Sequence, residues 1–100
     1  MNFVTVDFNL NQFFSVQESA FKEVIKYSFL KTKTVKLVNE PRISFEFDKM
    51  NIHIFLEIKV KSDIEIDNSI KEITKNIEQG ITNLIDTKPK NIQFNIVGFL

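Results

Sequence analysis

The sequence predicts an α+β fold, a two-layer sandwich in which two amphipathic helices cover one face of a small mixed sheet. Four segments alternate apolar and polar residues, which is typical of half-buried strands. Two longer segments repeat apolar residues at helical spacing. The expected order is strand, helix, three strands, helix and strand, so each helix connects strands that can share one sheet.

Length and composition indicate a single globular domain spanning residues 1–100. The chain is 43% hydrophobic and has no cysteine, which excludes disulfides, thiolate metal sites and thiol nucleophiles. Thirteen basic residues balance thirteen acidic ones, so the net charge offers little attraction to nucleic acid. No basic segment followed by an apolar one opens the sequence, and we expect a cytoplasmic protein.

The first two elements are predicted as a strand over residues 3–10 and a helix over residues 11–29. Asn9 or Asn11 is placed to cap the helix. One side of the strand is apolar, and so is one stripe of the helix, as these residues show: Val4, Val6, Phe8 and Leu10 in the strand; Phe13, Val16, Ala20, Val24 and Tyr27 in the helix.

Three further apolar residues, Phe14, Phe21 and Ile25, lie beside this stripe and widen it to roughly half of the helix circumference, against a usual minimum of about 100°. The excess predicts either burial under the hairpin and the segment around Leu37 or a contact surface for another copy or a partner. We take these three residues as the first candidate interaction surface.

A short strand over residues 33–40 is expected to end at Pro41, and a hairpin follows from residues 42–47 and 52–60. Pairing Phe47 with Ile52 matches apolar residues on one face of this hairpin. The same register places Glu46 opposite His53 and Arg42 opposite Glu57 on the other, solvent-facing side of the hairpin.

The last third predicts a helix over residues 67–86 and a strand over residues 91–99, with Pro89 between them. Asp67, or a capping box of Ser69 and Glu72, is expected to start the helix. If the strands on either side of this helix are parallel, the helix forms a crossover connection. The helix carries its apolar stripe at Ile70, Ile73, Ile77, Ile81 and Leu84.

Carboxylates at alternate positions, Asp63, Glu65 and Asp67, resemble the start of a calcium-binding loop. Asn68 and Thr74 occupy the places where that loop needs glycine and a bidentate glutamate, so we predict no metal site.

His53, the only histidine, faces Glu46 across the expected hairpin and could act as a general base. The chain has no second histidine, no nucleophile motif and no phosphate-binding glycine loop, so we predict no catalytic site, no cofactor and no small-molecule substrate. Glu46, His53 and Glu57 form instead a secondary candidate surface for a partner.

An RNA-binding module that uses the sheet face is the alternative function. Its support is two groups of lysines, which would form one patch if the two ends of the sheet adjoin. The two groups are Lys31, Lys33 and Lys36, and Lys88 and Lys90.

The order of elements resembles the alkaline-shock protein family of low-GC Gram-positive bacteria, over nearly the whole chain and most strongly over residues 52–98. The segments that carry the likeness are IHIFLEIKV, SDIEIDNSIKEITKNIEQGITNLI and PKNIQFNIVGF. The chain departs from the family in lacking a Gly-Val turn after its first helix and in placing Gly80 inside its second.

This resemblance implies a non-enzymatic scaffold or adaptor tied to cell-envelope or general stress. Some members of the family self-associate and are held at the membrane by a separate anchoring protein. The expectation for this chain is therefore a protein partner or self-association, with any membrane contact made indirectly.

Overall fold

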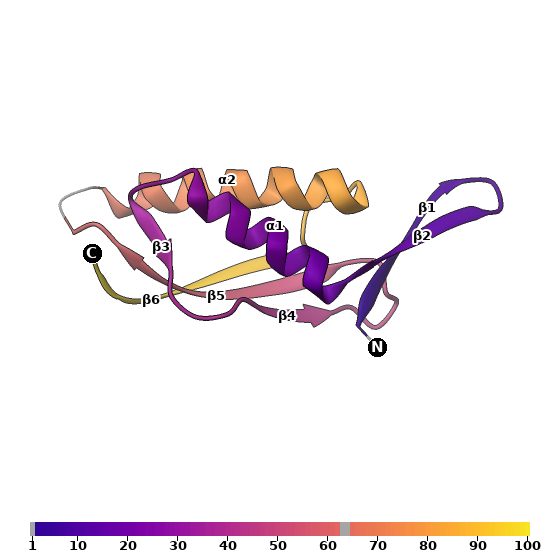
Figure 1. Cartoon of the computed structure of the whole chain (residues 1–100), viewed down its shortest axis with the longest axis horizontal. Helices are drawn as coiled ribbons and strands as arrows, with labels where there is room; N and C mark the ends of the chain where they lie inside the picture. Colours follow the sequence, from indigo (N-terminus) through magenta and orange to yellow (C-terminus); the bar gives the residue numbers. More distant parts are fainter. Residues whose placement is uncertain (1, 63–64) are drawn as a thin grey trace.

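A computed structural model describes residues 2–62 and 65–100 and confirms the two-layer α+β architecture (Figure 1). The molecule is elongated, with principal extents of 52 × 21 × 18 Å. Its elements in chain order are β1 (Phe3–Asn9), β2 (Gln12–Gln17), α1 (Glu18–Leu30), β3 (Val35–Leu37), β4 (Arg42–Phe45), β5 (Ile52–Val60), α2 (Ile66–Ile85) and β6 (Asn91–Phe99).

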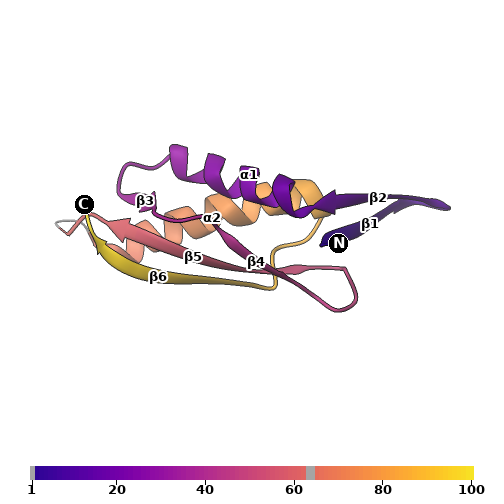
Figure 2. The same cartoon turned by 60° about the horizontal axis from the view of Figure 1, so that its bottom comes forward.

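The main sheet is built around β5. β3 and β4 pair antiparallel with the two ends of one edge of β5, and β6 pairs parallel with its other edge. The parallel pairing makes α2 the crossover connection that the sequence predicted. Both helices lie on the same face of this sheet, which leaves its other face open (Figure 2).

The core lies between the sheet and the helices. Every second residue of β5, from Ile52 to Val60, is buried on the helix side. α2 contributes a fully buried stripe of Ile73, Ile77 and Ile81, in agreement with its predicted periodicity. Such a stripe supplies most of the stability of a helix, because isolated helices of this length are marginal in water.

The β4–β5 hairpin forms, but its predicted register is wrong by two residues. Ile52 pairs with Phe45 rather than with Phe47, and Arg42 pairs with Phe55 rather than with Glu57. The chain turns through a longer loop, in which Lys49 adopts a φ of 61°. Because side chains alternate faces with a period of two, the even shift leaves the apolar face on the core.

The helix predicted over residues 11–29 begins only at Glu18, and the preceding six residues form the strand β2. β2 pairs antiparallel with β1, with Val16 opposite Val4 and Phe14 opposite Val6. The turn is closed by Asn11, whose φ of 64° is tolerated by asparagine. Phe13 and Val16 have helical spacing, whereas Phe14 and Val16 alternate as in a strand, so this segment fits both periods and the helix was predicted to start too early.

The start of α2 also differs from the prediction. The helix begins at Ile66, with Glu65 as the flanking residue, so neither Asp67 nor the box of Ser69 and Glu72 caps it. The Ser69 amide donates to the Glu65 carbonyl, and Asn68 donates its side-chain amide to the Glu65 carboxylate. Asp67 lies in the first turn instead, where its charge favours the helix dipole.

Candidate interaction surface

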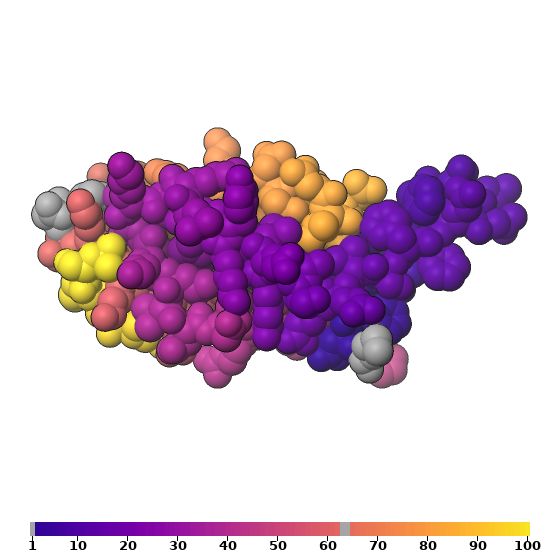
Figure 3. Space-filling view, viewed as in Figure 1, coloured from indigo at the N-terminus to yellow at the C-terminus, as the bar shows by residue number. Residues whose placement is uncertain are grey.

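The β1–β2 hairpin projects from one end of the molecule as an arm, which we define as residues 3–17 (Figure 3). Its base is anchored, because Val4, Val6 and Val16 are buried in the core. The Thr5 amide also donates to the Lys49 carbonyl at 2.9 Å, which joins the arm to the β4–β5 loop. The tip, residues 7–14, extends beyond these contacts into solvent.

The tip of the arm exposes four large apolar side chains. Phe8 is 57% exposed, Leu10 85%, Phe13 66% and Phe14 41%. The rings of Phe8 and Phe14 contact each other with centroids 5.5 Å apart. Asp7 is the only charged residue of the tip. Exposed aromatic side chains beside polar residues are typical of contact surfaces in protein complexes.

The first predicted surface, Phe14, Phe21 and Ile25, is wrong as a group. Phe21 and Ile25 are 0% exposed, and they form the core-facing side of α1. The Phe21 ring makes an edge contact with Phe45, at a centroid distance of 5.9 Å. Only Phe14 reaches the surface, and it does so from a strand of the arm. The alternative stated above, burial of these apolar residues in the core, is confirmed for Phe21 and Ile25, which are the two that lie in α1.

Sequence reasoning missed Phe8, Leu10 and Phe13 as surface residues. A signal was present: the segment NLNQ joins two apolar-rich runs, and asparagine favours tight turns. The two asparagines were instead interpreted as helix caps.

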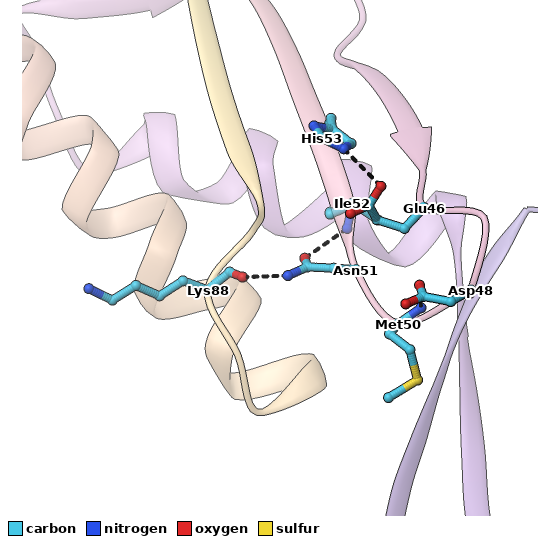
Figure 4. Close-up of polar contacts among 7 residues, drawn as sticks. All are labelled: Glu46, Asp48, Met50, Asn51, Ile52, His53 and Lys88. Atoms are coloured by element: carbon cyan, nitrogen blue, oxygen red, sulfur yellow. Dashed lines mark hydrogen bonds and ion pairs between the residues drawn. The ribbon is translucent and has the colours of Figure 1, made fainter.

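The secondary candidate surface is only partly assembled. The His53 Nε2 and Glu46 Oε2 atoms lie 3.1 Å apart, so the predicted contact forms (Figure 4). Ser44, rather than Glu46, is the direct strand partner of His53. Glu57 stands four residues further along β5 and accepts a hydrogen bond from Asn39 at 2.9 Å. The three residues therefore form two separate polar contacts.

The polar groups around the His53–Glu46 pair support the β4–β5 loop. Asn51 donates its side-chain amide to the Lys88 carbonyl at 2.9 Å, and the Asp48 carboxylate accepts the Met50 amide (Figure 4). Glu46 also lines a surface cavity of about 420 Å³ at the base of the arm, but His53 does not. This geometry gives His53 a structural hydrogen bond without placing it in that cavity.

The other sequence candidates are dispersed. Asp63 lies outside the described residues, and Glu65 and Asp67 belong to the start of α2. Within residues 2–62 and 65–100, no cluster of carboxylates and histidine is arranged to hold a metal ion.

The two lysine groups do not meet. Lys36 pairs with Lys59 near one end of β5, whereas the Lys90 amide donates to the Ile52 carbonyl at the other end. A strand of this length separates its ends by roughly 26 Å. The condition under which the lysines would form a single basic patch is therefore not met.

Comparison with known proteins gives no match to a family model, a curated protein or a solved structure. None of the helices that the structure describes has the length and apolar character needed to cross a membrane. The molecule is thus defined as a small α+β protein with an apolar arm, and its function must be inferred from its surfaces.

Proposed function

We propose that this chain is a non-enzymatic interaction module, a scaffold or adaptor that works by self-association or by binding an anchoring partner. The observation that carries this proposal is the arm, which holds Phe8, Leu10, Phe13 and Phe14 away from the core that anchors its base. Exposing four such side chains together costs solubility, and a contact surface is the usual reason for it.

The resemblance to alkaline-shock proteins supports the same class of function. It adds a role in cell-envelope or general stress, a cytoplasmic location and membrane contact only through a partner. An RNA-binding role has less support, because its lysines lie at opposite ends of β5.

The decisive experiment replaces two exposed residues at the tip of the arm. L10S/F13S removes much of the apolar surface without touching the buried base. The matched control, Y27S/L30S, removes two exposed apolar side chains from α1. Light scattering over a concentration series, and retention of proteins from the source cells on immobilised chain, are compared for the three proteins.

We expect L10S/F13S to lose a bound partner or a self-associated form that the control retains. A folded L10S/F13S variant with the same mass and the same retained proteins as the wild type would refute the role of the arm. Binding of single-stranded RNA at low salt that weakens steeply as salt rises would favour the alternative function.

A further inference from the structure

The outer edge of β6 is a free sheet edge of unusual composition. β6 is nine residues long, and no strand within residues 2–62 and 65–100 pairs with its outer side. The opposite edge of the sheet is divided between β3 and β4, which have three and four residues and are separated by Pro41. Short strands and prolines are devices that protect an edge from pairing with another chain.

Charge protection is also missing from β6. Residues 91–100 contain no charged side chain, although 26% of the whole chain is charged. The strand ends in an apolar segment whose Ile96, Val97, Phe99 and Leu100 side chains are exposed. A long, uncharged edge with exposed apolar residues is a template for another strand.

The side chains of β6 are self-complementary in one antiparallel register. Ile92 and Phe94 face the helix side of the sheet, with their partners Ile54 and Leu56 on β5, whereas Gln93 faces the open side with Phe55. A two-fold axis at Phe94 sets Ile92 against Ile96 of the second copy and Gln93 against Asn95. Apolar residues then meet apolar ones, and amides meet amides, which is the pattern that stabilises cross-strand pairs.

Neighbouring registers are less favourable. A shift by one residue places core-facing side chains opposite open-face ones. Centring the axis on Asn95 sets Ile92 against Gly98, which lies beyond the bulge at Val97 and pairs with Lys59 on the open face. Centring the axis on Gln93 keeps like side chains opposite each other but pairs only residues 91–95 of β6. The Phe94 register extends the matched pairs to Ile92 with Ile96 and still lies before the bulge at Val97.

We propose that β6 is a homodimer seam, at which a second copy of this chain adds its β6 antiparallel, with Phe94 opposite the partner's Phe94. The pairing joins the two sheets into one and leaves the helices of both copies on the same face. A second copy is favoured over a foreign strand because its side chains fit this edge and because two chains of zero net charge do not repel each other. The proposal deepens the proposed function, since it names one partner, and it uses a surface separate from the arm.

Single cysteines test the register, because the chain has none of its own. Q93C and N95C are purified separately and oxidised alone or after mixing. Directly opposed residues have Cα atoms about 4.5–5.5 Å apart, within disulfide range, whereas the same residue in both copies is diagonal at about 7–8 Å. We expect a covalent dimer from the mixture only. Efficient cross-linking of Q93C alone or of N95C alone would overturn the Phe94 register, because it would place the two-fold axis at Gln93 or at Asn95.

Lysines test the seam itself. In Q93K/N95K each new lysine lies opposite a lysine of the partner, and we expect dimerisation measured by light scattering to weaken roughly tenfold or more. N39K/S44K adds the same charge on or beside the other edge of the sheet and should dimerise as the wild type does. A thermal unfolding curve confirms that both variants fold.

The outcomes separate this seam from the arm. A wild type that stays monomeric at every concentration, or a Q93K/N95K variant that dimerises normally, overturns the seam and leaves binding through the arm intact. The substitutions L10S/F13S can also be added to both the Q93C and the N95C variants. If L10S/F13S loses its partner, but the mixture of these two combined variants still forms the covalent dimer, the arm and the seam act independently. Capture of a foreign strand in place of a second copy would also overturn the homodimer.

Discussion

Gly80 of α2 lies directly against Val24 of α1. A Cβ atom built on Gly80 would come within 2.6 Å of the Val24 Cγ1 atom, closer than van der Waals contact allows. The absence of a side chain at this position lets the two helices approach each other over the sheet. This contact explains why a glycine stands in the middle of a helix, where it costs about 1 kcal/mol relative to alanine.

Gly80→Ala should therefore destabilise the protein despite its better helix propensity. The added methyl meets a β-branched side chain with few alternative rotamers, so the helices must separate. We expect a net loss of about 1–2 kcal/mol in the free energy of unfolding, measured in urea. Adding Val24→Ala removes the clashing atom, and the double variant should be more stable than G80A alone. Additive losses in the double variant would contradict the steric explanation.

Phe21 tests the boundary between core and surface. Phe21→Ala removes a fully buried ring that contacts Phe45, and we expect a loss of about 3–5 kcal/mol in the free energy of unfolding. Phe13→Ala, on the exposed tip of the arm, should change stability by less than about 0.5 kcal/mol. Comparable losses in the two variants would show that the arm tip is packed rather than exposed.

The layers of this fold followed from sequence periodicity because α2, β5 and β6 each fit one period only. The stripe from Ile73 to Ile81 cannot face the core except in a helix, and the alternation in β5 fits only a strand. The segment of residues 12–17 is short enough to fit both periods. It forms a strand because it pairs with β1. Local patterns do not record such a partner.

The candidate surface was harder to predict for the same reason. Phe14, Phe21 and Ile25 would share one side of a continuous helix. In the structure, Phe14 belongs to the strand β2, whereas Phe21 and Ile25 belong to α1. The contact between His53 and Glu46 was predicted although the register was not, because a side chain can reach across a shift of two positions. The predicted side-chain contact therefore forms although the predicted backbone pairing is wrong.

Asp86 ends α2 with a left-handed φ of 61°, and its charge lies at the negative end of the helix dipole. Asp86→Gly should stabilise the protein by about 1 kcal/mol, because glycine adopts this conformation without strain. Asp86→Asn should give about half of that gain, since it removes only the charge. Urea midpoints measured at pH 7 check both variants. Lower midpoints for both would mean that the Asp86 carboxylate makes a stabilising contact.

Glu18 makes the stability of the arm–helix junction depend on pH. Its carboxylate accepts a hydrogen bond from Asn2 at 3.2 Å and pairs with Lys22 at 3.2 Å, and these contacts lower its pKa from the usual 4.5, the Asn2 bond most. A group with a lowered folded-state pKa contributes stability above its unfolded pKa, and this contribution is lost as the pH falls through the folded value.

Glu18→Gln should therefore lower the urea midpoint at pH 7, and the difference from the wild type should vanish below the lowered pKa of Glu18. Asn2→Ala should remove more of the pH-dependent difference than Lys22→Met, because the Asn2 bond is the larger cause. Added salt should weaken the Lys22 contribution and leave that of Asn2 nearly unchanged. If the two midpoints stay equally far apart from pH 7 to pH 3, the carboxylate charge of Glu18 plays no part in stability.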